Sequence, residues 1–304
     1  MSRGPARLLF LFLDGVGIGH KSHNPFFVAG IPVMRSLMGG TIADLRDCHR
    51  STARSSLVPL NATLGIAGLP QSGTGQSALL TGQNTSRLIG RHFGPYTFSS
   101  LKPVVMKDNL FVRLIQKGKK VCYANAFPQK YFDYIHSPRA RMTPIAFSWF
   151  STGLSFNGGQ ELRKGTALSA DITNERWPDL GYPDIEQITP GQAGRRLARL
   201  LHEHDFVFFE YFQTDHAGHH QSMEEAVACL ERIDELLGGF LEEAEDRNMT
   251  ALLTSDHGNM EDLSVKTHTR NPVPLLVFGP HHRRITEHAK TLTHVSREIM
   301  TLLT

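Results

Sequence analysis

The sequence predicts an α/β protein in which a mostly parallel β-sheet is sandwiched by helices and carries a small inserted cap. Continuous apolar runs bounded by turn residues recur along the chain, as is typical of strands buried on both faces. Helical patterns lie between these runs, and this alternation indicates an open α/β sheet. One long segment, residues 128–188, breaks the alternation and is interpreted as the cap.

The individual elements follow from these patterns. Strands are predicted at residues 8–13, 120–126, 205–212, 250–254 and 273–278. Helices are predicted at residues 109–117, 190–204 and 222–245. The last helix has the clearest pattern, because an apolar stripe recurs at helical period and Ser222 and Glu225 have capping-box spacing.

The same patterns suggest two domains, a core of residues 1–127 and 189–304 and a cap of residues 128–188. The cap segment has Pro, Gly and Arg without clean periodicity, and it holds Trp149 and Trp177, the only two tryptophans. A segment of this kind between sheet elements is expected to pack over one end of the sheet.

Composition excludes several classes of protein. The 304 residues are 40% hydrophobic and 20% charged, which fits a globular chain and excludes a disordered or fibrous one. A net charge of +3 without a dense Lys/Arg run argues against a nucleic-acid partner. Three widely spaced cysteines offer neither a disulfide framework nor a CxxC zinc site.

The amino-terminal apolar run is too short for a membrane span or for the apolar region of a signal peptide. It covers residues 8–13 and stops at Asp14, whereas these segments need about 18 and about 7–15 apolar residues. We therefore expect a cytoplasmic protein without a membrane partner.

Acidic residues follow three of the predicted strands, where ligands bind in open α/β sheets. These are Asp14, Asp215 and Asp256. An aspartate at a strand end is often only a turn residue or a helix cap. Three of them, each beside Gly or His, favour a functional site.

Three histidines accompany these aspartates. His219 lies four residues after Asp215, so both can share a helix face, and His257 adjoins Asp256. His268 lies in a loop before a proline-stiffened segment; taken alone, it is more typical of a surface residue. Three carboxylates and three imidazoles exceed one tetrahedral zinc site and favour two divalent ions, either Mn²⁺ or Zn²⁺.

A glycine-punctuated stretch at residues 69–82 offers hydroxyl nucleophiles in a loop that leads into a helix. A hydroxyl bound to a metal loses its proton more readily and can attack phosphorus. The alternative is a turn whose hydroxyls cap the helix.

These motifs together resemble the alkaline phosphatase superfamily, and within it the branch of cofactor-independent phosphoglycerate mutase and phosphopentomutase. The resemblance runs in family order from residue 8 to 279. It rests on Asp14-Gly15, the Ser72 loop with Thr81-Gly82, the Asp215-x-x-Gly-His219 motif, Asp256-His257-Gly258-Asn259, and His268 with its Asn-Pro-Val-Pro sequence.

The resemblance implies an alkaline-phosphatase-like core and a role for each motif. Asp215, His219 and His268 would bind one metal ion. Asp14, Asp256 and His257 would bind the other, with the Ser72 hydroxyl as a further ligand. Ser72 would be the catalytic nucleophile, with Thr74 as the runner-up.

The predicted function is phosphomonoester hydrolysis through a phosphoserine intermediate. The alternatives are a phosphomutase, which is an isomerase, and a zinc-dependent hydrolase of another class. Gln76 stands where the mutases carry histidine, and their second domain is reduced here to about sixty residues, so both features argue against mutase activity. The expected partner is a small phosphorylated substrate, held by basic residues that are equally well explained as a solvated surface: Arg87, Arg91, Lys130, Arg139 and Arg141.

Overall fold

The computed structural model describes residues 5–244 and 248–304, and within these ranges seven strands form one mixed sheet. The strand order is β2-β3-β9-β8-β1-β7-β4. Their bounds are β1 Arg7–Leu13, β2 Arg50–Ser51, β3 Ser55–Leu60, β4 Val121–Tyr123, β7 Phe206–Tyr211, β8 Met249–Thr254 and β9 Val273–Phe278.

Strands β4, β7, β1 and β8 are parallel, whereas β9 runs antiparallel to both β8 and β3. The predicted fold class, a mostly parallel sheet between helices, is therefore confirmed. Side chains of the central strand β1 alternate between two cores, with Leu9 and Leu11 in one and Leu8 and Phe10 in the other. Burial on both faces explains why this strand reads as a continuous apolar run.

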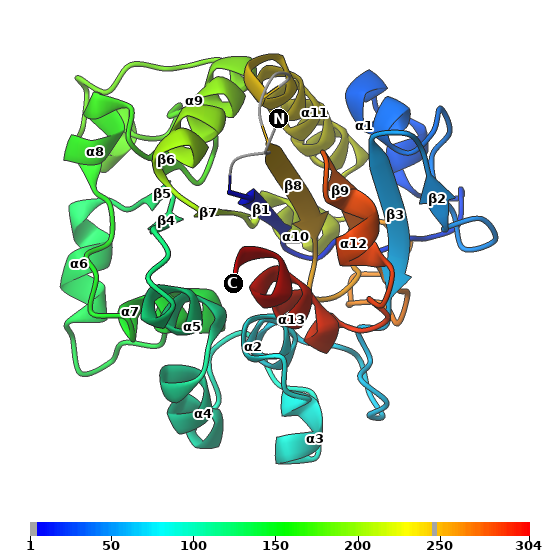
Figure 1. The fold of residues 1–304 in the computed structure, drawn as a ribbon, viewed down its shortest axis with the longest axis horizontal. Helices are drawn as coiled ribbons and strands as arrows, with labels where there is room; N and C mark the ends of the chain where they lie inside the picture. The colour runs from blue at the N-terminus through cyan, green and yellow to red at the C-terminus, as the bar shows by residue number, and fades with distance from the viewer. Residues whose placement is uncertain (1–4, 245–247) are drawn as a thin grey trace.

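Helices cover both faces of the sheet, above and below the strands in Figure 1. One face carries α1 Pro32–Leu37, α9 Pro190–Glu203 and α11 Met223–Ala244. The other carries α2 Ser72–Thr81, α5 Leu110–Gln116, α7 Pro144–Phe150, α12 His282–Thr286 and α13 Leu292–Leu303. No helix in the described ranges is both long and apolar enough to cross a bilayer.

The close approach of α9 and α11 depends on glycine. A Cβ atom on Gly194 would overlap the Leu236 carbonyl oxygen, and one on Gly239 would overlap the Gly191 carbonyl oxygen. The predicted helix at residues 222–245 corresponds to α11, and its last residue, Glu245, lies outside the described residues. The Ser222 hydroxyl accepts a hydrogen bond from the Glu225 amide, which is one half of the predicted capping box. The other half does not form among the described residues, because the Glu225 carboxylate pairs with His220 and the Ser222 amide donates to the Ala217 carbonyl oxygen.

Two parts of the sheet differ from the prediction. The single strand expected at residues 120–126 is divided into β4 and β5 Asn125–Ala126, and β5 pairs with β6 Leu168–Ser169 in a separate small sheet. Strands β2 and β3 were not predicted, because their serines and Pro59 do not form an apolar run.

The remaining elements are η1 Pro25–Phe27, α3 Thr85–Ile89, η2 Ser99–Leu101, α4 Lys102–Lys107, α6 Gln129–Ile135, α8 Gly159–Lys164, η3 Pro178–Leu180 and α10 Gln213–His220.

The segment predicted as a cap contributes to two different apolar clusters. Trp177 packs with Leu162 and Ile185 in a small separate cluster, and Leu162 belongs to α8, which lies at the left of Figure 1. Trp149 instead packs edge-on against Phe111 in a core of the main sheet. The division into a core and a cap at residues 128–188 stays a prediction.

Candidate metal centre

The three aspartates lie together because β1, β7 and β8 are parallel neighbours that end at the same edge. Asp14 follows β1 directly, and Asp256 follows β8 after one residue. Asp215 lies in the first turn of α10, which starts just after β7. Gly15 permits the close approach of these elements, because it has a φ of +67° and a Cβ atom there would overlap the Asp215 carboxylate.

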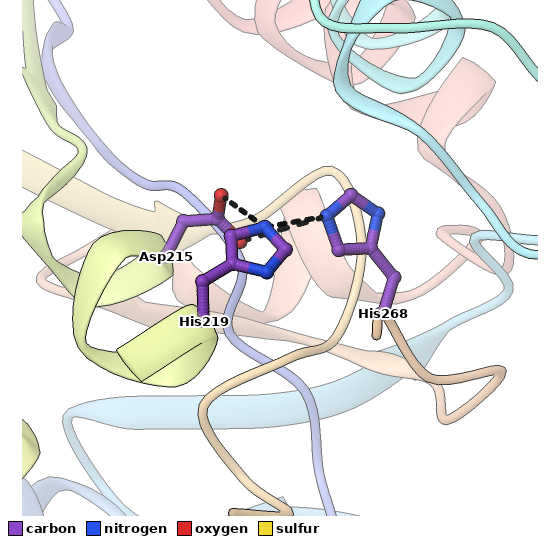
Figure 2. Close-up of side chains that lie close together, drawn as sticks. All are labelled: Asp215, His219 and His268. Carbon is purple, nitrogen blue, oxygen red and sulfur yellow. Dashed lines mark hydrogen bonds and ion pairs between the residues drawn. The ribbon is translucent and has the colours of Figure 1, made fainter. Parts of the chain in front are cut away.

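Asp215, His219 and His268 form the first group of metal-type ligands (Figure 2). One ligand atom from each lies within 4.8 Å of the others. His219 Nε2 is 3.2 Å from Asp215 Oδ2 and 3.2 Å from His268 Nε2. Asp215 and His219 come from one helical turn, and His268 faces them from a separate loop.

Asp14, Asp256 and His257 form the second group, again with ligand atoms within 4.8 Å of one another. His257 Nε2 lies 3.5 Å from Asp14 Oδ1, 3.6 Å from Asp256 Oδ2 and 3.0 Å from the Ser72 hydroxyl oxygen. The imidazole rings of His257 and His268 stack with centroids 3.7 Å apart, so the two groups adjoin. The structure thus brings together all six metal-type residues and Ser72.

The histidines are oriented by main-chain carbonyl groups. Nδ1 of His268 lies 2.8 Å from the Pro70 oxygen, and Nδ1 of His219 lies 3.0 Å from the Lys266 oxygen. A ring nitrogen beside a carbonyl oxygen must carry the proton, which leaves Nε2 with a free lone pair. Two such Nε2 atoms cannot hydrogen-bond to each other, so their separation of 3.2 Å fits a shared cation.

Charge at this edge is unbalanced without a cation. Burial, followed by the charges of Asp256 and Asp215, raises the pKa of Asp14 well above its usual value, and burial also raises the pKa of Asp256. Burial lowers the pKa of His268 to about 4, and the charge of His257 adds to this effect. Asp14 Oδ1 and Asp256 Oδ2 are buried and accept no hydrogen bond from the residues that the structure describes.

Asp215 behaves differently from its two neighbours. Burial acts to raise the pKa of its carboxyl, but the charge of His257 and the hydrogen bond from Asn259 outweigh it and lower the pKa. Burying carboxylate oxygens that lack hydrogen-bond partners, as those of Asp14 and Asp256 do among the described residues, costs free energy, and divalent cations would satisfy them. The donor set of carboxylate oxygens and imidazole nitrogens suits Zn²⁺ or Mn²⁺.

Ser72 is the first residue of α2, at the start of a helix that is buried along its whole length. The helix lies close to the metal-type residues, because a Cβ atom on Gly75 would lie 2.8 Å from the Asp256 carbonyl oxygen. The Thr74 hydroxyl donates to the Gln71 carbonyl oxygen, 3.2 Å away, and accepts from the Phe93 amide. Of the two candidate nucleophiles, the geometry therefore favours Ser72.

The five basic residues proposed to hold substrate are all exposed and lie at different places. The Arg141 guanidinium lies 6.0 Å from the Tyr96 ring centroid, and Arg91 lies over the Phe93 and Phe98 rings. Within the described part of the chain, none of the five forms a hydrogen bond or ion pair with the metal-type residues. Their substrate role stays a prediction, also for Arg87 on α3, Lys130 on α6 and Arg139 in the loop after α6.

Two buried glutamates at the site were missed from the sequence. Glu261 is fully buried and accepts hydrogen bonds from the Gly17 and Asn259 amides, each 2.8 Å away, and from the Thr269 hydroxyl and Asn271 side chain. It thereby joins the loops that carry Asp14, Asp256 and His268. The available signal was its position, five residues after Asp256.

Glu210 is the second missed residue. It lies near the end of β7, and its carboxylate accepts a hydrogen bond of 2.6 Å from the Tyr123 hydroxyl. Burial raises the pKa of Glu210 to about 7, although the hydrogen bond from Tyr123 favours the charged form. A single acidic residue inside a buried apolar strand was the signal available in the sequence.

Glu261→Gln is expected to weaken divalent-metal binding roughly ten- to a hundredfold, the usual effect of removing a group that orients metal ligands. The amide NH₂ group of glutamine would face N–H and O–H donors, so the loops would lose their common acceptor. Calorimetric titration with Mn²⁺ or Zn²⁺ measures the change. Asp262→Asn is the matched control, because among the described residues the Asp262 side chain accepts hydrogen bonds only from Ser264, and the change should leave the affinity as it is. Equal affinities in the two variants would contradict the orienting role.

Comparison with known proteins supports a metalloenzyme. The family model described as Metalloenzyme superfamily matches residues 190–304. The chain is 38% identical over 82 residues to the 2,3-bisphosphoglycerate-independent phosphoglycerate mutase of Saccharolobus solfataricus, a match that covers 27% of this chain and 19% of the relative. The corresponding mutase of Desulforudis audaxviator is 31% identical over 130 residues, 41% of this chain and 25% of the relative. The chain thus matches a quarter or less of the length of these relatives.

Solved structures show the same fold at low sequence identity. Alkaline phosphatase from the Antarctic bacterium TAB5 has a TM-score of 0.57 and 12% identity, covering 100% of this chain and 99% of that chain. The PH0037 protein from Pyrococcus horikoshii also has a TM-score of 0.57, with 15% identity, and covers 100% and 98% of the two chains. The fold of the whole described chain is therefore that of alkaline phosphatases.

Proposed function

Because this chain belongs to the alkaline phosphatase superfamily of metalloenzymes, we propose that it hydrolyses small phosphate monoesters through a phosphoserine at Ser72. The observation that carries the proposal is the Ser72 hydroxyl oxygen, which lies 3.0 Å from His257 Nε2 at the junction of the two ligand groups. A nucleophile at this place can attack the phosphorus atom of a phosphate ester whose phosphate oxygens face the two groups of metal-type ligands.

Asp215, His219 and His268 would hold one divalent ion, and Asp14, Asp256 and His257 would hold the second. Such a pair of ions, Mn²⁺ or Zn²⁺, supplies positive charge that stabilises the entering and leaving oxygens of a phosphoryl displacement and lowers the pKa of a bound hydroxyl. The buried carboxylate oxygens of Asp14 and Asp256, which accept no hydrogen bond among the described residues, support this assignment.

The reaction has two steps, transfer of the phosphoryl group to Ser72 and hydrolysis of the phosphoserine. The Ser72 oxygen forms a bond to phosphorus as the ester P–O bond breaks, and the serine proton is balanced by the proton that the leaving alcohol takes up. Water then attacks the phosphoserine, which releases phosphate and restores the Ser72 hydroxyl. The start of α2 positions the serine, and main-chain amides at a helix N-terminus favour a phosphate group.

Hydrolysis and phosphoryl transfer to a second substrate hydroxyl differ only in the acceptor. The Gln76 side chain donates to Asp14 Oδ2 at 3.3 Å, at the position where the mutases that the sequence resembles carry histidine. Glutamine cannot exchange a proton with an acceptor hydroxyl, so this residue favours water as the acceptor. Product analysis separates the two reactions, because a mutase yields an isomeric ester and a hydrolase yields inorganic phosphate.

Metal removal tests the proposal directly. Treatment with a chelator is expected to abolish phosphate release from a panel of small phosphate esters, and Mn²⁺ or Zn²⁺ should restore it with more than one ion bound per chain. Phosphate release and elemental analysis are the measurements, with circular dichroism as the control for folding. Undiminished hydrolysis by the folded, metal-free protein would contradict the two-metal assignment.

A further inference from the structure

A cavity of about 380 Å³ lies where β7 ends, and most of its lining residues come from the segment predicted as a cap. This volume is within the roughly 300–1,000 Å³ typical of small-molecule sites. Six of its eighteen lining residues are aromatic, and the rings come from β4, the segment after β5, α6, the residue after β7 and the η3 region. They are Tyr123, Phe127, Tyr131, Tyr134, Trp177 and Phe212.

The cavity adjoins the metal centre along α10. Phe212 and Gln213 line it, and the next residue, Thr214, donates a hydrogen bond of 2.5 Å to the Asp14 carbonyl oxygen. Asp215 of the first metal group follows on the same turn. Glu210 also lines the cavity, and its charge is close enough to contribute to the raised pKa of Asp14.

A series of contacts also links the cavity to the nucleophile. Met142 lines it, and its carbonyl oxygen accepts a hydrogen bond of 3.0 Å from the Thr97 amide. The preceding residue, Tyr96, has its carbonyl oxygen so close to Gly73 that a Cβ atom there would overlap it. Gly73 follows Ser72 directly, so one wall of the cavity is joined to the start of α2.

Polar groups in the aromatic wall have unused hydrogen-bonding capacity. The Tyr131 hydroxyl is buried and has no hydrogen-bond partner among the described residues. The Glu210 carboxylate accepts from Tyr123 through one oxygen, Oε2, and no hydrogen bond to its other oxygen is formed within the described ranges. Arg141 supplies positive charge at the rim, where the Tyr134 hydroxyl accepts from its main-chain amide.

We propose that this cavity binds the planar heteroaromatic part of the substrate, so that the favoured phosphate esters are nucleoside monophosphates. Aromatic walls stack on a flat ring, and the Tyr131 hydroxyl and Glu210 carboxyl are placed to bond its polar edge. A plain phenyl ring would leave the Tyr131 hydroxyl and the second Glu210 oxygen without a hydrogen bond, which is costly in a buried site. The proposal rests on the proposed phosphatase function for the reaction, but the binding step can be tested without it.

Binding of adenosine, which has no phosphate, tests the cavity alone. Calorimetric titration of the unmodified chain should detect binding, and Tyr131→Phe should weaken it about five- to tenfold without lowering Tm, because the hydroxyl has no hydrogen-bond partner among the described residues of the free protein. Tyr182→Phe is the matched control, since the Tyr182 hydroxyl accepts from the Gln129 amide and does not line the cavity. It should lower Tm slightly and leave adenosine affinity as it is.

Turnover tests the substrate class. The ratio of kcat/KM for adenosine 5′-monophosphate to that for glycerol 3-phosphate should exceed ten and should fall at least fivefold in Tyr131→Phe. Tyr134→Leu removes a ring at the exposed rim and should lower the same ratio. This variant replaces Tyr131→Phe in the test if Tyr131→Phe does not fold. A higher kcat/KM for phenyl phosphate than for the nucleotide would overturn the heteroaromatic assignment.

The outcomes separate the two proposals. Absence of adenosine binding, together with hydrolysis of glycerol 3-phosphate, overturns the cavity assignment and leaves the phosphatase function intact. Adenosine binding that is sensitive to Tyr131→Phe, without hydrolysis of any ester, supports the cavity and overturns the proposed function. Equal adenosine affinity in Tyr131→Phe and Tyr182→Phe overturns the proposed contact with the Tyr131 hydroxyl.

Discussion

Ser72→Ala is expected to lower kcat for phosphate-ester hydrolysis on the order of a thousandfold or more, because it removes the only atom to which the phosphoryl group is proposed to be transferred. The Ser72 oxygen lies 3.0 Å from His257 Nε2, so the lost group is in the centre of the site. Metal affinity should fall less, because the six carboxylate and imidazole ligands remain. Steady-state kinetics and elemental analysis measure the two effects.

Thr74→Ala is the matched control for the nucleophile. Its hydroxyl bonds to main-chain groups of Gln71 and Phe93, so the change should lower stability more than turnover. Mass spectrometry of the enzyme quenched during turnover should find phosphate on Ser72 and none on Thr74. Label on Thr74 would make the nucleophile assignment wrong, and normal turnover by Ser72→Ala without label would favour attack by water.

His219→Ala is expected to weaken binding of the first metal ion roughly a hundredfold or more and to reduce turnover to near background. The variant removes the Nε2 atom that lies 3.2 Å from both Asp215 Oδ2 and His268 Nε2. Removing one of three ligands leaves Asp215 and His268 facing each other without the geometry that holds a cation. Metal titration followed by phosphate-release assays checks this result.

His220→Ala provides a control on the same helix. His220 Nδ1 bonds to the Glu225 carboxylate at 2.8 Å, and the pair is exposed, so its loss should have little effect on stability. Metal content and turnover should match those of the unmodified chain. If His220→Ala lost metal as completely as His219→Ala, the first ligand group would be incorrectly assigned.

Much of the main sheet and its longest helices could be predicted from local patterns. Strands β1, β7, β8 and β9 are apolar runs because both faces of the sheet are covered, and α11 shows a clear apolar stripe. The single strand expected at residues 120–126 was wrong, because β5 leaves the main sheet to pair with β6. That change of partner depends on residues more than forty positions away, which local patterns do not encode.

The sequence by itself determined the chemical types at the site: three aspartates at strand ends, three histidines in the motifs beside them, and hydroxyls before a helix. Their proximity follows from the parallel pairing of β1 with β7 and β8, which places three strand ends at one edge. Only the tertiary structure decided that Glu261 joins three loops and that Glu210 borders an aromatic cavity. These roles arise from contacts between segments up to 244 positions apart, where burial and hydrogen-bond geometry, rather than local periodicity, determine what a carboxylate does.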